Sequence, residues 1–326
     1  MINIGINGFN IISKMIIYNI IKKKDKNINI VAINIANEKI NIDKFIYILK
    51  YDNIYKLSKI IIIKDIKKDK IIINNKFIIK IINENNINNL NWKKYKAKYI
   101  IETTYTLNPN IHIKNGANKV ILTYPNFDYP IYVFGVNHSN LKKENNIISY
   151  ASNTTNCLSP ILKILHREYK VLECFITILQ NSNFSEYDII NNYLNIIPYK
   201  SKVNKEIYKV LPEMYKKIKD ITFKIPNYIY VSVVDLTIRF KKSTNYEKIK
   251  KIIKFYSKNE LTGILKYINK DIIYTDILYN KMISIFDAKS SIMLNNNFFK
   301  LICWYNNVIG YSNKIIDFII YIEYNY

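Results

Sequence analysis

The order of apolar and polar positions in the first 124 residues predicts strands that alternate with helices. Residues 1–6 and 28–35 are short apolar runs typical of buried strands, and residues 11–24 between them place apolar side chains at helical spacing. This order forms a βαβ unit and indicates a doubly wound parallel sheet. We expect further strands at 59–64, 70–82, 99–102 and 120–124, and a further helix at 43–50.

After residue 150 the pattern changes to long strands with few helices between them, which predicts a second, α+β domain with a mostly antiparallel sheet. Strands are expected at 171–180, 228–240, 271–278 and 298–305, and helices at 157–169, 246–258 and 313–324. The predicted fold class is therefore α/β. The domains are expected at 1–151 and 152–312, with a C-terminal helix at 313–326 that packs back on the first domain.

Composition excludes several classes of protein. No apolar run approaches the roughly 18 to 20 residues of a membrane-spanning helix, and residues 1–5 do not resemble a signal peptide, so we expect a cytoplasmic protein without a membrane partner. The three cysteines, Cys157, Cys174 and Cys303, form no CxxC motif and no metal-spaced group with histidines. We therefore expect neither disulfides nor a metal site.

The formal net charge of +24 raises nucleic acid as a partner, because lysine-rich surfaces bind phosphate by releasing counterions. The lysines are, however, scattered among isoleucine, asparagine and tyrosine, which are all encoded by AT-rich codons. A compositional bias accounts for the charge without a ligand, and a charged face is more often only solvated. We therefore consider nucleic acid an unlikely partner.

Two of the six glycines, Gly5 and Gly8, fall in the first strand-to-helix turn. Such a turn requires positive φ or close backbone approach, which glycine supplies. A dinucleotide-binding fingerprint would have further glycines where this chain has Asn10 and Ser13, so the motif alone is a weak signal.

Longer motifs resemble those of the glyceraldehyde-3-phosphate dehydrogenases, in the same order along almost the whole chain. They include Gly-Ile-Asn-Gly-Phe at 5–9, Gly-Val-Asn-His at 135–138, Ala-Ser-Asn-Thr-Thr-Asn-Cys-Leu at 151–158, Lys-Val-Leu-Pro-Glu at 209–213 and Trp-Tyr-Asn-Asn at 304–307. The resemblance implies a Rossmann domain that binds NAD and a catalytic domain. It also implies a homotetramer that oxidises glyceraldehyde 3-phosphate with inorganic phosphate.

The two catalytic positions of that family hold other residues here. Asn153 stands where the family has its nucleophilic cysteine, and Gln180 stands where it has its histidine base. A carboxamide has no ionisable thiol and cannot shuttle a proton near neutral pH, so the covalent route through a thioester has neither nucleophile nor base. Asn153 instead suits a helix N-cap.

Cys157 is the alternative nucleophile, but neither it nor the histidines are well placed for the reaction. Cys157 lies one helical turn beyond Asn153, which displaces its sulfur by roughly 6 Å, and His166 points to the opposite face of the expected helix. A buried structural cysteine is the simpler interpretation. We interpret His112 and His138 as structural too.

On the cofactor side, the resemblance implies contacts from the helix N-terminus at Asn10, Ile11 and Ile12, from Thr123, and from Asn313 to the nicotinamide carboxamide. Ile35 replaces the acidic residue that accepts hydrogen bonds from the adenosine ribose, a loss of order 1–3 kcal/mol in a dry site. Asn34 or Asn37 could compensate. We expect weakened NAD binding.

On the substrate side, Ser152, Thr154 and Ser201 match phosphate-contacting hydroxyls of the family. Lys202 replaces a glycine, and Lys224 replaces an arginine, which keeps the charge and loses the bidentate fork. The segment between Gln180 and Asn195 is shorter than in the family, and this segment normally meets the cofactor site of a neighbouring subunit.

The leading hypothesis is a family member with reduced or absent catalysis. One alternative is a weak dehydrogenase that oxidises a hydrated aldehyde without covalent catalysis, with water positioned by Gln180 or Thr154. Another is a non-catalytic scaffold that binds NAD, phosphate or nucleic acid. A decaying gene product without a function is the third.

Overall fold

The computed structural model describes residues 1–23, 27–36, 40–51, 61–65, 69–181, 195–225 and 231–326. Contacts divide the chain into two compact units. The first contains Met1–Tyr132, Asn140–Tyr150 and Ile315–Tyr326, and the second contains Val133–Ser139 and Ala151–Lys314. No helix among these described residues is long and apolar enough to cross a membrane.

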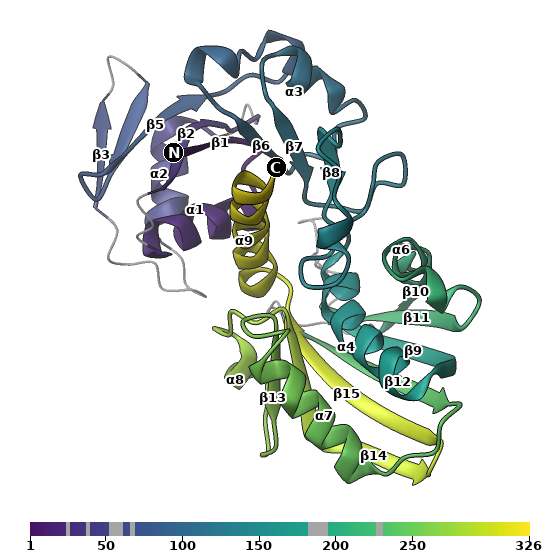
Figure 1. The fold of residues 1–326 in the computed structure, drawn as a ribbon. Coiled ribbons are helices and arrows are strands. Elements are labelled where there is room, and N and C mark those ends of the chain that lie inside the picture. The colour runs from purple at the N-terminus through teal and green to yellow at the C-terminus, as the bar shows by residue number, and fades with distance from the viewer. Residues whose placement is uncertain (24–26, 37–39, 52–60, 66–68, 182–194, 226–230) are drawn as a thin grey trace. The chain divides into compact units, whose positions relative to one another are not determined.

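The first unit is built on a sheet of eight strands in the order β3-β4-β5-β2-β1-β6-β7-β8 (Figure 1). In this order, the six strands β5, β2, β1, β6, β7 and β8 run parallel to their neighbours. Strand β4 is antiparallel to both β3 and β5. The strands are β1 (Ile2–Asn7), β2 (Ile28–Asn34), β3 (Ile62–Asp65), β4 (Lys70–Ile73), β5 (Phe77–Ile82), β6 (Tyr99–Glu102), β7 (Lys119–Leu122) and β8 (Ile147–Ser149).

Helices α1 (Ile11–Lys23), α2 (Ile42–Lys50) and α3 (Asn110–Lys114) connect these strands, together with the short 3-10 helices η2 (Ile87–Asn89), η3 (Lys93–Tyr95) and η4 (His138–Asn140). The C-terminal helix α9 (Ile309–Asn325) begins four residues before the expected start. Its Glu323 accepts from Lys98 and Tyr99 of the first unit, at 2.6 Å each, and these bonds tie the end of the chain to β6.

The second unit contains a seven-stranded, mostly antiparallel sheet in the order β10-β11-β9-β12-β15-β14-β13. Helices α4 and α7 pack on one face of it, and α6 packs on α4 and β11 (Figure 1). The helices are α4 (Asn153–Tyr169), α6 (Val203–Val210), η5 (Pro212–Met214), α7 (Tyr246–Lys258) and α8 (Tyr274–Ile277). The strands are β9 (Val171–Asn181), β10 (Ile197–Tyr199), β11 (Ile218–Ile225), β12 (Val231–Phe240), β13 (Leu265–Ile268), β14 (Ser284–Asn295) and β15 (Phe298–Asn306).

The predicted fold class is confirmed: a Rossmann-type sheet rich in parallel strands is followed by a mostly antiparallel one. Two predicted strands were wrong. Residues 70–82 form a hairpin, because Asn74 and Asn75 both take positive φ, near 50°, and reverse the chain. Residues 274–277, within the expected strand at 271–278, form helix α8 instead. Parts of the strands expected at 59–64 and 228–240 lie outside the described residues.

Candidate functional site

Strand β1 lies between β2 and β6, so the chain adds later strands first on one side of β1 and then on the other. The carboxyl end of β1 is therefore the switch point of this sheet. Open α/β sheets bind ligands outside the strands at such a switch point. The turn after β1 passes very close to the end of β6. Gly8 has a φ of +94°, and a Cβ there would lie 2.4 Å from Thr103 Oγ1 and 2.5 Å from Thr104 Cγ2. Only glycine fits this turn.

Asn10 caps the N-terminus of α1 with its own side chain. Its Oδ1 accepts from the backbone N–H groups of Ile12 at 3.0 Å and Ser13 at 3.1 Å, and its Nδ2 donates to the Thr103 carbonyl at 3.0 Å. In dinucleotide-binding folds, free N–H groups at the N-terminus of this helix bind a phosphate of the ligand. In this chain a carboxamide oxygen already occupies them, and Ile11 is the first residue of the helix that follows.

At the end of β2, Ile35 is buried, with 2% of its surface exposed, and lines a pocket of about 360 Å³ together with Asn41, Lys80 and Tyr95. The neighbouring Asn34 does not compensate for an acidic residue there. Its Nδ2 donates to Asn7 Oδ1 at 2.8 Å and to the Glu84 carbonyl at 2.9 Å, and its Oδ1 accepts from Glu84 N at 2.9 Å. Residue 37 lies outside the described part of the chain.

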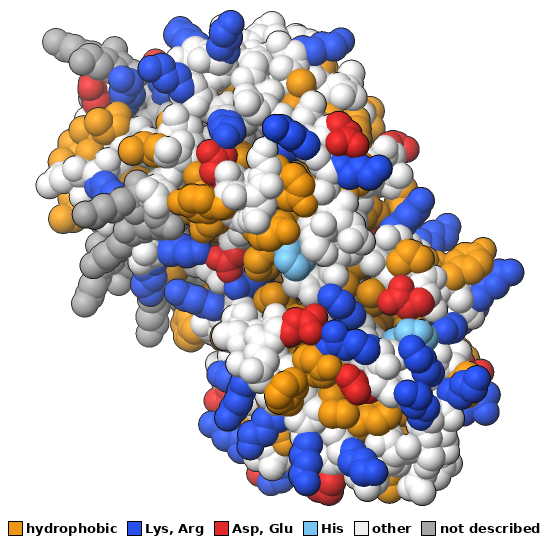
Figure 2. Space-filling view, in the orientation of Figure 1, with side chains coloured by type: hydrophobic (Ala, Val, Ile, Leu, Met, Phe, Trp, Pro, Cys, Tyr) orange, Lys and Arg blue, Asp and Glu red, His pale blue; other side chains and the backbone are white. Residues whose placement is uncertain are grey.

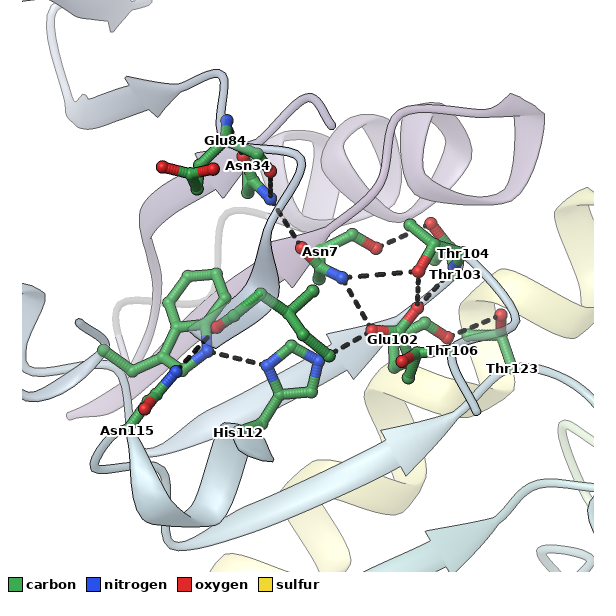
Figure 3. Close-up of polar contacts among 12 residues, drawn as sticks. Asn7, Asn34, Glu84, Glu102, Thr103, Thr104, Thr106, His112, Asn115 and Thr123 are labelled. Atoms are coloured by element: carbon green, nitrogen blue, oxygen red, sulfur yellow. Dashed lines mark hydrogen bonds and ion pairs between the residues drawn. The ribbon is translucent and has the colours of Figure 1, made fainter. Parts of the chain in front are cut away.

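A buried polar network joins the carboxyl ends of β1 and β6 beneath this turn (Figure 3). Glu102 is fully buried, and its Oε2 accepts from Asn7 Nδ2 and from His112 Nε2, each at 2.7 Å. Its Oε1 accepts from the Thr104 hydroxyl at 2.6 Å. Thr123, half-buried after β7, donates to the Glu102 carbonyl at 3.0 Å. His112 is therefore part of the structural core of this unit.

In the second unit, Ser152 and not Asn153 is the N-cap of α4, contrary to the expectation. The Ser152 Oγ accepts from Thr155 N at 3.2 Å, and Asn153 is the first residue of the helix. The serine has the extended backbone that an N-cap requires, and it presents its hydroxyl to the first turn. Asn153 is half-buried at the start of this helix.

Cys157 follows one turn later in α4 and is fully buried. Its sulfur lies 3.8 Å from Ser284 Oγ and 3.9 Å from the Trp304 carbonyl. Burial raises the pKa of the Cys157 thiol to about 12. The thiolate, the nucleophilic form, is therefore scarce at neutral pH.

Gln180 and Lys224 are brought together on neighbouring strands. Strands β9 and β11 are parallel, and the two residues are paired in register, both half-buried. Lys224 Nζ lies 4.6 Å from the centroid of the Tyr199 ring, a cation–π contact with the edge strand β10. The segment after Asn181, expected to be shorter than in the family, lies at residues 182–194, outside the described residues.

The expected phosphate-contacting hydroxyls are engaged within the unit. Ser152 Oγ donates to Thr155 Oγ1 at 2.9 Å, the buried Thr154 hydroxyl is 2.6 Å from the Tyr305 hydroxyl, and Ser201 Oγ donates to Asp220. Lys202 is exposed at the start of α6. Asn313, half-buried in α9, makes no side-chain hydrogen bond to a described residue.

Nothing in the described ranges suggests a metal, because no group of three or more His, Cys, Asp or Glu side chains there could hold one. His166 is half-buried in α4, and its pKa is lowered mainly by burial and secondly by the positive charge of the nearby Lys217. Lysine and arginine side chains are spread over the face drawn in Figure 2, with acidic side chains among them.

Comparison with known proteins decides the family. Residues 2–109 match the model of the glyceraldehyde 3-phosphate dehydrogenase NAD binding domain, and residues 152–307 match that of the C-terminal domain of the same enzyme. The chain belongs to the glyceraldehyde-3-phosphate dehydrogenase family. The recognition made from the sequence motifs is thereby confirmed.

The curated relatives span the whole protein. A glyceraldehyde-3-phosphate dehydrogenase of Cochliobolus lunatus is 35% identical over 345 residues, covering 99% of this chain and 98% of the relative. One of Sclerotinia sclerotiorum is 36% identical over 337 residues, covering 98% and 97%. A cytosolic one of Sinapis alba is 33% identical over 337 residues, covering 99% and 98%.

Within this dehydrogenase fold, sequence reasoning missed the acidic partners of the site. Glu206 and Asp220 contact Ser152 and Ser201, although 54 and 19 residues separate the pairs. Glu102 holds the turn of the NAD binding domain from 95 residues away. No local pattern marks these residues. They are identified only by the buried donors and acceptors with which they pair in three dimensions.

Proposed function

We propose that this chain is a glyceraldehyde-3-phosphate dehydrogenase homologue that retains the fold and has lost the covalent chemistry. The observation that carries the proposal is Asn153 at the first residue of α4, in place of the family's nucleophile. A helix N-terminus stabilises a thiolate and so activates a cysteine at that position. A carboxamide there gains nothing comparable, because it has no proton whose loss produces a nucleophile.

Two further observations support the loss of catalysis. The buried sulfur of Cys157 is enclosed by Ser284 and the Trp304 carbonyl, with a raised thiol pKa, so it cannot attack an aldehyde in place of residue 153. Gln180 is beside Lys224 and has no group that titrates near neutral pH. None of these residues can therefore act as a general acid or base toward a substrate.

Binding of NAD is expected to be weak for reasons specific to the first unit. The glycine turn after β1 is of the kind that dinucleotide-binding folds use, and Ile11, Ile12 and Thr123 would lie beside the dinucleotide. NAD, when bound, supplies the hydride acceptor. The backbone N–H groups of Ile12 and Ser13 that would bind the pyrophosphate, however, already donate to Asn10 Oδ1. The buried Ile35 side chain offers no acceptor for a ribose hydroxyl. A pyrophosphate must displace the Asn10 carboxamide before it can bind.

We also propose that the protein is a cytoplasmic homo-oligomer, a tetramer by resemblance. The face of the second sheet opposite α4 and α7 carries exposed apolar side chains, with Phe175 at 66%, Ile221 at 42% and Leu179 at 38% exposure. A second copy of the chain would remove this surface from water. Light scattering of the purified protein tests this proposal, and a monomer at micromolar concentration would refute it.

The catalytic proposal is tested by NADH formation from glyceraldehyde 3-phosphate, with and without inorganic phosphate. We expect no phosphate-dependent turnover by the natural chain. An Asn153→Cys, Gln180→His double variant restores nucleophile and base and should give measurable turnover. Turnover by the natural chain that requires phosphate would refute the proposal.

A Cys157→Ser variant is the matched control, because it removes the only other cysteine of the signature segment at 151–158. In the double-variant background it should leave turnover unchanged within about twofold, because the new thiol at position 153 carries the reaction. If that substitution abolished turnover while the protein remained folded by circular dichroism, Cys157 would be the nucleophile and the role assigned to position 153 would be wrong.

A further inference from the structure

The N-terminus of α4 is occupied by an internal carboxylate. Glu206 reaches it from α6, and its Oε2 accepts from Ser152 N at 2.7 Å and from Thr155 Oγ1 at 2.8 Å. Glu206 is 2% exposed, and burial raises the pKa of its carboxyl. Burial works against the anion of Glu206, and the hydrogen-bond donors and the positive end of the helix dipole offset only part of that cost. The end of the helix therefore already has a carboxyl group on the donors that a phosphate would need.

A second carboxylate takes the donors at the start of α6. Asp220 in β11 accepts from the Ser201 hydroxyl through Oδ2, and its Oδ1 accepts from Asn204 N at 3.2 Å. The Ser201 oxygen also accepts from Val203 N at 3.3 Å. The single proton of the Ser201 hydroxyl is thus committed to Asp220 and is not available to a ligand.

The hydroxyls of Ser152 and Thr154 also have partners inside the unit. Ser152 Oγ donates to Thr155 Oγ1, and Thr154 Oγ1 is 2.6 Å from the hydroxyl of the fully buried Tyr305. A phosphate is recognised by converging donors, above all by charge-assisted ones. Three of its expected donors, Ser152, Thr154 and Ser201, have partners inside the protein.

We infer that Glu206 and Asp220 make this unit selective against phosphorylated ligands. A phosphate placed against Ser152 and Ser201 would meet two carboxylates and no free hydroxyl proton from these serines. The exposed Lys202 and the half-buried Lys224 carry positive charge nearby, but a lysine is a point charge without a fixed fork and does not replace the lost donors. The Asn153 and Gln180 carboxamides suit an uncharged carbonyl or hydroxyl compound.

This inference deepens the proposed function by naming the ligand class of the same site, and its test does not depend on catalysis. The probe is inorganic phosphate, titrated calorimetrically into the natural chain and into Glu206→Gln, Asp220→Asn and the double variant at constant ionic strength. The amides keep the shapes of the acids and remove their charge. We expect phosphate to bind the double variant at least about tenfold more tightly than the natural chain.

Glu213→Gln is the matched control, because Glu213 is an exposed acid in η5 of the same unit and makes no hydrogen bond to a described residue. Its loss changes the net charge by one, as each single variant does, and should alter phosphate affinity by less than about twofold. Equal phosphate affinity in the natural chain and the double variant would overturn the inference, and so would an equal gain in Glu213→Gln. If Glu206→Gln does not fold, Asp220→Asn alone decides, with a gain of about threefold or more expected.

The failure of this inference is distinguishable from that of the proposed function. Phosphate-dependent NADH formation by the natural chain would refute both. Phosphate binding by the natural chain as tight as by the double variant, without NADH formation, would refute only the selectivity against phosphate and leave the catalytic proposal intact.

Discussion

The indole N–H of Trp92 donates to Nδ1 of His112 across 2.9 Å, and both side chains are fully buried. Because an indole nitrogen can only donate, Nδ1 must be the unprotonated ring nitrogen. Nε2 therefore carries the hydrogen and donates to Glu102 Oε2 at 2.7 Å. With this tautomer, His112 connects α3 to β6. Glu102 also accepts a hydrogen bond from Asn7 at the end of β1, so the network extends to that strand (Figure 3).

Removal of the imidazole should destabilise the NAD binding domain more than removal of the indole N–H. His112→Ala removes one of the donors to the buried Glu102 carboxylate, leaves the Trp92 indole N–H without its partner and opens a cavity, at a cost of about 3–5 kcal/mol. Trp92→Phe leaves chiefly His112 Nδ1 unpaired and should cost about 1–3 kcal/mol, with a contribution from the smaller ring. Urea unfolding followed by circular dichroism measures both losses of unfolding free energy.

His138→Ala is the control for the previous variants. His138 is half-buried, and its Nδ1 accepts from Gly135 N at 3.0 Å. Its loss should cost about 1 kcal/mol. A loss for His112→Ala no larger than that for His138→Ala would show that the network does not hold the fold.

The fold could be predicted from the sequence because its signals are local. The apolar runs at 99–102 and the helical spacing at 246–258 gave β6 and α7 with their observed bounds. The hairpin at residues 70–82 was missed because nearly every residue of both strands is apolar, and the two asparagines of the turn are lost among the many others in the chain.

The candidate site was only partly predictable. Motif order placed Asn153 and Gln180, and the register of β9 with β11 brings Gln180 beside Lys224. The N-cap was assigned one residue too late, because Ser and Asn cap helices about equally well and both precede the first turn. The roles of Glu206 and Asp220 depend on contacts between separate elements, which no spacing along the chain encodes.

Asn10 is expected to limit the affinity for NAD, because its Oδ1 holds the N–H groups of Ile12 and Ser13. Asn10→Gly frees these groups at little cost to the helix, since glycine is tolerated at an N-cap. The affinity for NAD should rise about tenfold, a change of about 1.4 kcal/mol. Asn10→Asp keeps the cap and adds a negative charge beside the incoming pyrophosphate, so it should weaken binding. Calorimetric titration with NAD measures both, and an Asn10→Gly affinity at or below that of the natural chain would contradict the prediction.

Glu206 should make stability depend on pH in the direction opposite to that of a salt-bridged acid. Burial raises the pKa of its carboxyl in the folded chain above the ordinary value of 4.5, so the folded state binds the proton more tightly than the unfolded state. The contribution of this group to stability is therefore most favourable below pH 4.5, falls as pH rises through the folded pKa, and is lowest above it. Glu206→Gln retains an acceptor for Ser152 N and has no proton to lose. The unfolding free energy of the natural chain minus that of Glu206→Gln should decline as pH rises from 4.5 in urea titrations. A difference that rises over that range would mean that the donors from Ser152 and Thr155 outweigh burial and hold Glu206 as a stabilised anion.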